Sequence, residues 1–325
     1  MESLRSAATK PDSEEASAHE HALQVRLKAG HQIEREEEMT PRYREVLIQT
    51  MLIAADLELM TLPSYYGALV NAPDLDAKIA VASSVQDEMG HAQVMYRMLE
   101  DFGFDAQELI FERPPSAFKT FELIEQDVSD YVICAVMMTL GDRAGYITTR
   151  DLEAHCSFGP YARSLRKVNY EERFHVAHGE RWVKTYWNHS PETRRRVQDA
   201  VDLLFPMSAS WFGTPDGMKK RTDQLTYRIR GLTNDELRQQ WLNEVVPFCE
   251  SLGIRVPAHF NAEQGRYVLD YEEPVSLDPV SRKWDLEHRT TWEEKFANWK
   301  KGGPIKRSGI ERIQNERWGD ALWTA

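Results

Sequence analysis

The sequence has few cysteines, and none of them is placed to hold a metal cluster. Only three occur in 325 residues, Cys134, Cys156 and Cys249, and no two form a Cys-x-x-Cys pair. Isolated cysteines in odd number are typical of reduced thiols in a cytoplasmic protein rather than of a disulfide framework. Three thiolates also fall short of the four ligands of an all-cysteine iron–sulfur cluster. We therefore expect a cytoplasmic chain without such a cluster.

Targeting segments and nucleotide-binding loops are missing as well. Residues 1–21 are polar and lack the apolar stretch of an export signal. The longest unbroken apolar run, residues 131–138, is far shorter than the ~20 residues that span a bilayer. Because this run is so short, we expect no association with a membrane. Neither GxGxxG nor GxxxxGKS/T occurs, so we expect no flavin or NAD bound to this chain.

Positive charge is scarce relative to negative charge. The 40 lysines and arginines against 52 aspartates and glutamates leave a formal net charge of −12 at pH 7. A chain this acidic is not expected to bind nucleic acid as a whole. Because 42% of its residues are apolar, it can still bury a sizeable core.

Strand patterns are nearly absent, and helical patterns dominate. Thr40-Pro41 predicts a helix N-cap followed by a proline in the first turn, and Thr233-Asn234-Asp235-Glu236 predicts a capping box. Pro63 is expected to kink or break the first helix. Residues 104–126 predict a long connection, and residues 265–271 a short strand pair. Apolar spacing predicts helices over approximately residues 41–70, 75–102, 128–155, 160–187, 190–211 and 233–253.

Two Glu-x-x-His motifs are the first feature that indicates chemistry. Of the ten histidines, only His91 and His175 follow a glutamate by three residues, Glu88 and Glu172 respectively. Positions i and i+3 share one face of a helix, so both side chains of a motif can reach a common point. A single such motif arises easily by chance, whereas two within apolar helical patterns are more informative.

Each motif has a further acidic residue thirty positions before it. Glu58 stands before Glu88, and Asp142 stands before Glu172. The predicted turns near residues 71–74 and 157–160 lie about midway, so the two carboxylates of each helical hairpin are expected at equal depth. Two such hairpins packed face to face would gather four carboxylates and two histidines. This is the ligand set of a carboxylate-bridged di-iron or di-manganese site in a four-helix bundle.

We therefore predict an all-α fold, a ferritin-like four-helix bundle with extra C-terminal helices and an irregular tail. The bundle is expected over residues 39–255, with residues 104–126 as its long crossover connection. Residues 1–38 are charged and poorly periodic, and we expect a mobile or partner-binding arm. Residues 256–325 would form a C-terminal extension.

Imidazole and carboxylate ligands suit two iron ions, with manganese as the alternative. The competing interpretation is that these acids and histidines are solvated helix faces or satisfied core side chains. Burying four carboxylates without a cation would cost many kcal/mol, which favours the metal site. Asp87 and Glu171 directly precede the two motif glutamates. They could each accept a hydrogen bond from the distal N–H of a ligating histidine, or be ordinary surface acids.

Longer segments around these motifs resemble a known family. The chain is similar to the catalytic A subunits of ring-1,2-phenylacetyl-CoA epoxidases, ferritin-like di-iron monooxygenases of phenylacetic acid catabolism. The likeness runs from about residue 40 to about 275, and the N-terminal arm and the tail after about 278 depart from the pattern. The segments that carry it are QDEMGH (86–91), FGPYAR (158–163), YEERFH (170–175) and TNDELRQQW (233–241).

The resemblance implies an activity and a set of partners. Two irons would activate O2 and deliver one oxygen atom to the aromatic ring of an aryl-CoA thioester as an epoxide. The two electrons would come from a separate NADPH-dependent reductase. A small coupling protein is implied as well, together with a ferritin-like structural sister subunit. The family's metal-binding and catalytic positions correspond to Glu58, Glu88, His91, Asp142, Glu172 and His175.

Substrate-binding residues are predicted less sharply. An anionic CoA group needs a local basic patch, and the candidates are Lys219-Lys220-Arg221 with Arg228 and Arg230, or Arg194–Arg196. These can equally be solvated charges. The residues near the ligands in sequence that could line an aromatic pocket, or simply pack in the core, are Tyr65, Tyr66, Tyr146, Met89 and Phe174.

Three functions stay open at this stage. The first is the aryl-CoA monooxygenase. The second keeps the site but changes the chemistry, to a di-iron oxygenase or oxidase with another substrate, or to a rubrerythrin-like peroxidase. The third is a non-catalytic assembly subunit, which the complete ligand set argues against.

Overall fold

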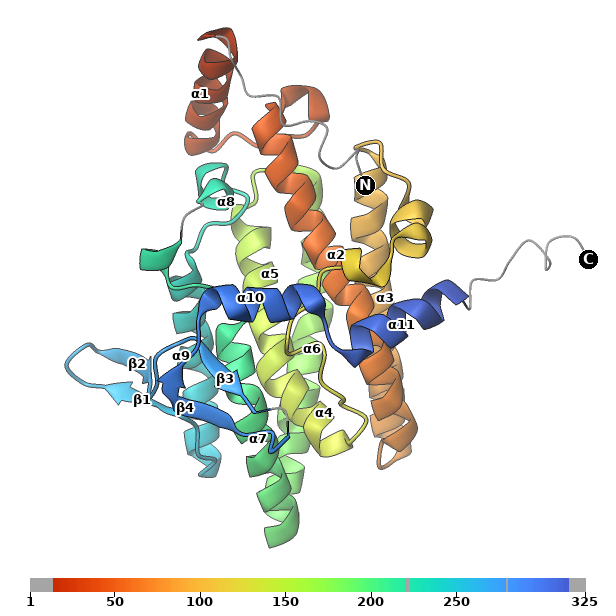
Figure 1. Ribbon diagram of the computed structural model, residues 1–325, viewed down its shortest axis with the longest axis vertical. Helices are drawn as coiled ribbons and strands as arrows, with labels where there is room; N and C mark the ends of the chain where they lie inside the picture. The colour runs from red at the N-terminus through yellow and green to blue at the C-terminus, as the bar shows by residue number, and fades with distance from the viewer. Residues whose placement is uncertain (1–13, 220–221, 279, 316–325) are drawn as a thin grey trace, which may run out of the picture.

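The computed structural model describes residues 14–219, 222–278 and 280–315, and helices dominate it (Figure 1). Two long antiparallel hairpins form its centre. Helices α2 (Pro41–Asn71) and α3 (Leu75–Glu100) make the first hairpin. The second pairs α6 (Gly159–His189) with a segment made of α4 (Tyr131–Met137), a π turn η4 (Met138–Asp142) and α5 (Arg143–His155). The prediction of an all-α bundle is confirmed.

Helix α2 begins as predicted but does not break. The Thr40 hydroxyl accepts a hydrogen bond from the backbone N–H of Tyr43, with Pro41 as the first helical residue. The helix then continues through Pro63 to Asn71, so the break, one of the two expectations at this proline, does not occur. Extensive packing of α2 against α3 compensates for the one backbone hydrogen bond that a proline removes.

The third predicted helix is interrupted where one continuous helix was expected. Its π turn, η4, spans Met138–Asp142 and inserts extra backbone just before α5. Gly141 lies in this turn, where a Cβ atom would approach the Met137 sulfur to 2.7 Å and Leu123 Cδ2 to 2.9 Å. Such bulges re-aim the residues that follow them and occur often at functional sites. Here the residue at the end of the turn is Asp142.

The connection from α3 to α4 crosses the bundle without a long element of its own, as predicted. It contains only η2 (Glu108–Glu112) and η3 (Pro115–Ala117). It is attached to α2 by the buried Asp56, whose carboxylate accepts from the Arg113 guanidinium at 2.5 Å and from the backbone N–H of Lys119 at 2.8 Å. The connection therefore forms a fixed part of the structure beside α2.

Four further helical elements follow the two central hairpins. They are α7 (Pro191–Ser210), η5 (Asp216–Met218) and α8 (Asp223–Thr226), followed by α9 (Asn234–Leu252). The predicted capping box of α9 is present, because Thr233 and Glu236 each bond the other's backbone N–H. Trp241 of α9 is fully buried and donates from Nε1 to the carbonyl of Leu140 at 2.9 Å. This bond ties α9 to the π turn.

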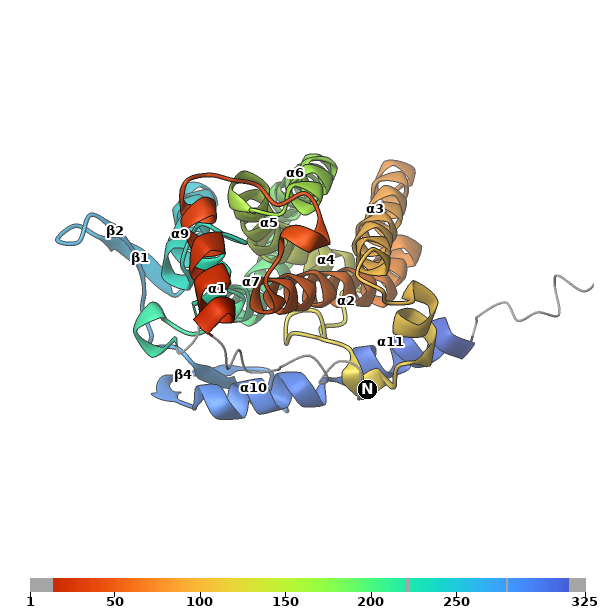
Figure 2. The same cartoon turned by 90° about the horizontal axis from the view of Figure 1, so that it is seen from above.

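The C-terminal extension is more ordered than the irregular tail that the sequence suggested. Two antiparallel hairpins, β1 (Ala258–Asn261) with β2 (Arg266–Leu269) and β3 (Val275–Leu277) with β4 (Trp284–Arg289), precede two helices. Helices α10 (Trp292–Lys301) and α11 (Pro304–Asn315) lie along one side of the bundle (Figure 2). The order comes from burial, since Trp292 and Ile310 lie almost entirely inside the molecule.

Part of residues 1–38 forms helix α1 (Glu14–Lys28) and the short η1 (Glu36–Glu38). Leu23 and Leu27 of α1 are buried, and the backbone N–H of Ile33 donates to the carbonyl of Ser157 at 2.7 Å. These contacts place the segment at one end of the bundle. The domain boundaries at residues 38 and 255 stay predictions.

Helix α2 is long and apolar enough to cross a membrane by length and composition. Half of its most apolar stretch, however, is buried against the rest of the structure. Core helices of globular proteins pass the same test of length and composition, and the buried Asp56 lies in this helix.

Candidate metal centre

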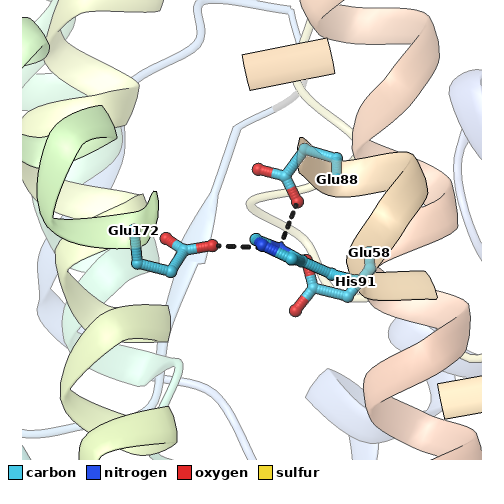
Figure 3. Close-up of side chains that lie close together, drawn as sticks. All are labelled: Glu58, Glu88, His91 and Glu172. Carbon is cyan, nitrogen blue, oxygen red and sulfur yellow. Dashed lines mark ion pairs between the residues drawn. The ribbon is translucent and has the colours of Figure 1, made fainter. Parts of the chain in front are cut away.

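Four helical segments bring the six predicted ligand residues to one place inside the bundle. Their oxygen and nitrogen atoms form two overlapping groups, and within each group the candidate ligand atoms lie within 4.8 Å of one another. Figure 3 shows the first group, in which the carboxylates of α2, α3 and α6 surround His91. The first group is Glu58, Glu88, His91 and Glu172, and the second is Glu88, Asp142 and His175.

The two motif glutamates lie between the two histidines. Glu88 has one oxygen 3.8 Å from His91 Nδ1 and the other 3.5 Å from His175 Nδ1. One oxygen of Glu172 likewise lies 3.5 Å from His91 Nδ1, and its other oxygen lies 3.8 Å from His175 Nδ1. Each carboxylate therefore presents one oxygen to each side of the site, which is the arrangement of a bridging ligand.

The other two carboxylates each face one histidine. Glu58 approaches His91 Nδ1 to 3.6 Å, and Asp142 approaches His175 Nδ1 to 4.0 Å. Glu58 and His91 belong to the first hairpin, and Asp142 and His175 to the second. Each hairpin thus contributes one histidine with its own terminal carboxylate, and the two motif glutamates lie between these halves.

The companions Asp87 and Glu171 contact the histidines from the far side, and each bonds the histidine of the other helix. Glu171 lies 3.1 Å from His91 Nε2, and Asp87 lies 3.3 Å from His175 Nε2. A carboxylate at Nε2 favours the tautomer that carries its proton there, which leaves a lone pair on Nδ1. Both Nδ1 atoms point toward the site carboxylates.

Burial and mutual repulsion displace the pKa values of these groups. Burial, together with the neighbouring carboxylates, raises the pKa of Glu88 and Glu172 well above the ordinary value. Burial raises the pKa of Asp142 to about 6. For His91, burial acts in the opposite direction, but bonding to Glu58 and the charge of Glu172 raise its pKa to about 9. Without a cation, the cluster therefore holds protons at neutral pH.

The donor set fits a pair of divalent metal ions. The Nδ1 atoms of His91 and His175 and one oxygen of Glu88 are fully buried and have no hydrogen-bond partner. Buried polar atoms are rarely left unpaired, and these three are lone-pair donors that a metal ion could bind. Four carboxylates and two imidazoles are the ligands that iron and manganese use in such bundles.

Tyr65 is the one predicted pocket tyrosine that contacts the cluster. Its phenol donates to Asp142, with both carboxylate oxygens at 2.6 Å, and it lines the adjacent cavity. Tyr66 is 55% exposed and Tyr146 lies beneath the Arg150 guanidinium. Neither of these two lines the cavity, nor do the half-exposed Met89 and Phe174.

A cavity of about 660 Å³ opens beside the cluster. Glu58, Glu88, Asp142 and Glu172 form part of its wall, and most of the remaining wall is apolar or aromatic. This volume lies within the range of small-molecule sites. The large apolar residues of the wall come from α2, the crossover, α5, the turn after α7 and α10, and include Leu57, Phe118, Phe121, Leu152, Trp211, Phe296 and Trp299.

Three basic side chains line this cavity, and only one of them belongs to the predicted basic patch. Arg230 lines it, as do Lys119 and Lys300, which the sequence did not single out. Lys219 bonds Asn234 instead, at 3.2 Å, and Arg196 pairs with Asp130 at 2.6 Å. The predicted Lys220 and Arg221 lie outside the described residues. Only the crossover and the ordered tail bring Lys119 and Lys300 to the cavity, so no local pattern could have identified them.

Known proteins give an independent comparison. The sequence matches the model of a protein family described as phenylacetic acid catabolic protein over residues 12–303. It is 26% identical over 301 residues to a protein of Escherichia coli (strain K12) that is named as the A subunit of 1,2-phenylacetyl-CoA epoxidase. That alignment covers 91% of this chain and 97% of the relative. The family resemblance inferred from the motifs is confirmed.

Proposed function

The chain belongs to the phenylacetic acid catabolic protein family, and from this premise we propose that it is the oxygen-activating subunit of a ring epoxidase. In this proposal the reaction consumes O2, two electrons and two protons, and one oxygen atom is added to the aromatic ring of an aryl-CoA thioester as an epoxide. The second oxygen atom leaves as water. The relative's name, which includes phenylacetyl-CoA epoxidase, supports this choice of reaction.

One observation carries the proposal: two histidines and four carboxylates converge beside an apolar cavity. Glu88 and Glu172 would help to hold both metal ions, because each presents one oxygen to His91 and the other to His175. Glu58 and Asp142 would be the terminal carboxylates. When bound, two iron ions would supply the reduction of O2. The cavity next to them offers a site for the molecule that receives the oxygen atom.

The surrounding residues would hold the ligands in place. Asp87 and Glu171 keep the proton of each histidine on Nε2, so that Nδ1 stays free to bind. The Tyr65 hydroxyl orients the Asp142 carboxylate through its 2.6 Å hydrogen bond. Large apolar side chains such as Leu57 and Phe121 would limit the access of water to a substrate ring lying beside the cluster.

The cavity also supports a CoA thioester as the substrate class. Its apolar wall suits an aryl group, while Lys119, Arg230 and Lys300 can attract the anionic part of CoA despite the chain's net charge of −12. The Nε atom of Arg230 is buried and unpaired, so it can donate to an acceptor in this cavity. We infer that the thioester enters here.

Several further components are part of the proposal. The word "subunit" in the relative's name supports a multisubunit complex for this chain as well. We expect a separate NADPH-dependent reductase, a small coupling protein and a ferritin-like sister subunit, in the cytoplasm. Iron is the expected metal and manganese the alternative, because both suit imidazole and carboxylate ligands.

The apolar cavity also separates the alternatives. A rubrerythrin-like peroxidase reduces a small molecule and needs no organic pocket of about 660 Å³. A non-catalytic assembly subunit needs neither the pocket nor unpaired ligand atoms. The cavity therefore favours an oxygenase with an organic substrate. A paralogous di-iron oxygenase on another substrate would share these features and is distinguished by the turnover experiment below.

The first test is the metal content of the full chain, purified with any partners that accompany it. We expect close to two irons per chain, and the loss of both in His91→Ala and in His175→Ala. His178→Ala is the matched control, since His178 is a buried histidine of α6, the helix of His175, that bonds Tyr131 at 2.8 Å and lies outside the cluster. The absence of stoichiometric metal after anaerobic Fe(II) loading would overturn the metal site.

The second test is turnover in the reconstituted complex. NADPH consumption that depends on phenylacetyl-CoA, with an oxygenated CoA thioester as product, is expected for the epoxidase. Peroxide consumption without any CoA thioester would favour the peroxidase instead. Turnover of another organic substrate in place of phenylacetyl-CoA would keep the di-iron oxygenase and change its substrate.

A further inference from the structure

Helix α10, in the C-terminal extension, reaches the substrate cavity. Phe296, Trp299 and Lys300 of this helix line the same cavity as the four site carboxylates. Figure 2 shows α10 lying outside the bundle, alongside the elements that carry the cavity. The helix therefore closes the cavity on a side that the four bundle helices leave open.

Aromatic rings connect α10 with the interior of the bundle. The ring of Trp299 lies 4.3 Å from that of Phe121 in the crossover, and Phe121 lies 5.3 Å from Trp211, the residue directly after α7. Trp211 in turn donates from Nε1 to the Thr148 hydroxyl of α5 at 3.1 Å. Thr148 follows Asp142 along α5 by roughly 9 Å at 1.5 Å per residue. The aromatic row thus runs along the cavity within reach of a ligand placed beside Asp142.

The contacts of α10 hold it in one position. Lys295 is buried, and its Nζ lies 3.2 Å from the Glu122 carboxylate of the crossover and 3.4 Å from the carbonyl of Val275. The Lys295 ammonium also lies over the ring of Trp284, 5.0 Å from its centre. A helix fixed by a buried ion pair at its middle is a wall of the cavity rather than a hinged lid.

Trp299 has one polar group without a partner. Its indole Nε1 is buried and makes no hydrogen bond, which is unusual for a buried tryptophan. Trp211, in the same aromatic row, does bond its Nε1 to Thr148. A ligand with a carbonyl acceptor, such as the amides or the thioester of an acyl-CoA, could satisfy the Trp299 N–H.

We propose that α10 sets the substrate range of this enzyme, with Trp299 and Phe296 as the residues that limit the size of the acyl group. This inference rests on the proposed function, because it assumes that an aryl-CoA thioester occupies the cavity. Removing the indole of Trp299 would enlarge the cavity beside Phe121 and admit a bulkier aryl group. It would also remove the unpaired N–H donor.

The test compares binding of phenylacetyl-CoA and 1-naphthylacetyl-CoA to the full chain by calorimetry, without reductase so that no turnover occurs. We expect Trp299→Ala to shift the ratio of the two Kd values about tenfold toward the naphthyl thioester. Trp187→Ala is the matched control, because it removes an equally large buried side chain that does not line the cavity. Thermal melting reports whether each variant is folded.

Each outcome decides the proposal. A Trp299→Ala variant that folds and keeps the wild-type ratio overturns it, as does an equal shift in Trp187→Ala. If Trp299→Ala does not fold, Phe296→Leu and Trp299→Phe retain much of the packing, and an unchanged ratio in both overturns the inference. Wild-type protein that binds neither thioester would contradict the proposed substrate class itself, and the metal content would still test the centre separately.

Discussion

At the scale of single residues, the buried carboxylates work against folding when no cation is present. Glu88 and Glu172 have pKa values well above the ordinary one, because they are buried and face other carboxylates. A group whose pKa is raised in the folded chain contributes stability below its unfolded pKa and loses it as the pH rises through the folded pKa. The metal-free chain is therefore less stable at higher pH because of these residues.

Glu88→Gln is expected to stabilise the metal-free chain and to abolish stoichiometric metal binding. The amide keeps the shape of the side chain but cannot ionise, so folding no longer requires this buried side chain, which faces Glu58 and Asp142, to take up a proton that the unfolded chain has released. We expect Tm to rise by about 2 °C or more, with a larger gain at pH 8 than at pH 6 because only the glutamate titrates. Differential scanning calorimetry and metal analysis measure the two effects.

The control for this variant is Glu100→Gln, on the exposed end of the same helix. It should leave both Tm and metal content unchanged. A Glu88→Gln chain that melts below the wild type in metal-free buffer would show that the carboxylate contributes to stability by itself, against the electrostatic account.

At the scale of elements, the position of Asp142 depends on how closely α6 approaches the segment of α4, η4 and α5. Gly179 of α6 lies against α4 and the π turn, where an added Cβ atom would be 2.8 Å from the Ala135 carbonyl and 2.8 Å from the Thr139 nitrogen. Backbone atoms cannot move aside as the end of a side chain can. The absence of a side chain at Gly179 thus allows the close packing that brings His175 and Asp142 together.

Gly179→Ala is expected to destabilise the chain by about 1–3 kcal/mol through overpacking. It should also weaken metal binding, because α6 must shift away from η4. Gly90→Ala is the matched control, since nothing lies within 4 Å of a Cβ atom at that helical position. There we expect a gain of about 0.5–1 kcal/mol from the better helix former. Urea unfolding of both metal-free variants measures the difference, and equal effects would contradict the packing argument.

At the scale of the whole molecule, metal ions and protons compete for the same buried carboxylate oxygens and histidine nitrogens. Occupied ligands must be deprotonated, so metal binding releases protons and becomes tighter as the pH rises. In the metal-free chain, His91 contributes stability that is complete below its ordinary pKa of 6.5 and is lost as the pH rises through about 9. For Asp142 the loss runs from its ordinary pKa of 3.8 through about 6.

The difference in Tm between the metal-loaded and the metal-free chain should therefore increase from pH 5 to pH 9. Melting curves of both forms across this range test the expectation, with a chelator added to the metal-free samples. The double variant His91→Ala, His175→Ala should show no added stability from metal at any pH. A difference that stays constant or decreases with pH would contradict the assignment of these groups as ligands.

Much of this architecture could be predicted from the sequence, because it depends on local periodicity. The Glu-x-x-His spacing places both side chains of a motif on one helix face, and equal distances to the turns place the motifs at equal depth. The helix bounds and the caps at Thr40 and Thr233 follow from local rules in the same way. The metal role of the six residues stays a prediction that their convergence supports.

Other features were decided only by the tertiary structure. Local rules predicted a kink or break at Pro63, but α2 continues through this proline because it packs against its neighbours. They also predicted one continuous helix through Gly141, where the structure has a π turn instead. The crossed bonds of Asp87 and Glu171 depend on how the two hairpins face each other. Lys119 and Trp299 reach the cavity only because the crossover and the C-terminal extension pack against the bundle. Local sequence encodes helix faces, whereas contacts between distant segments depend on how the whole chain buries its apolar surface.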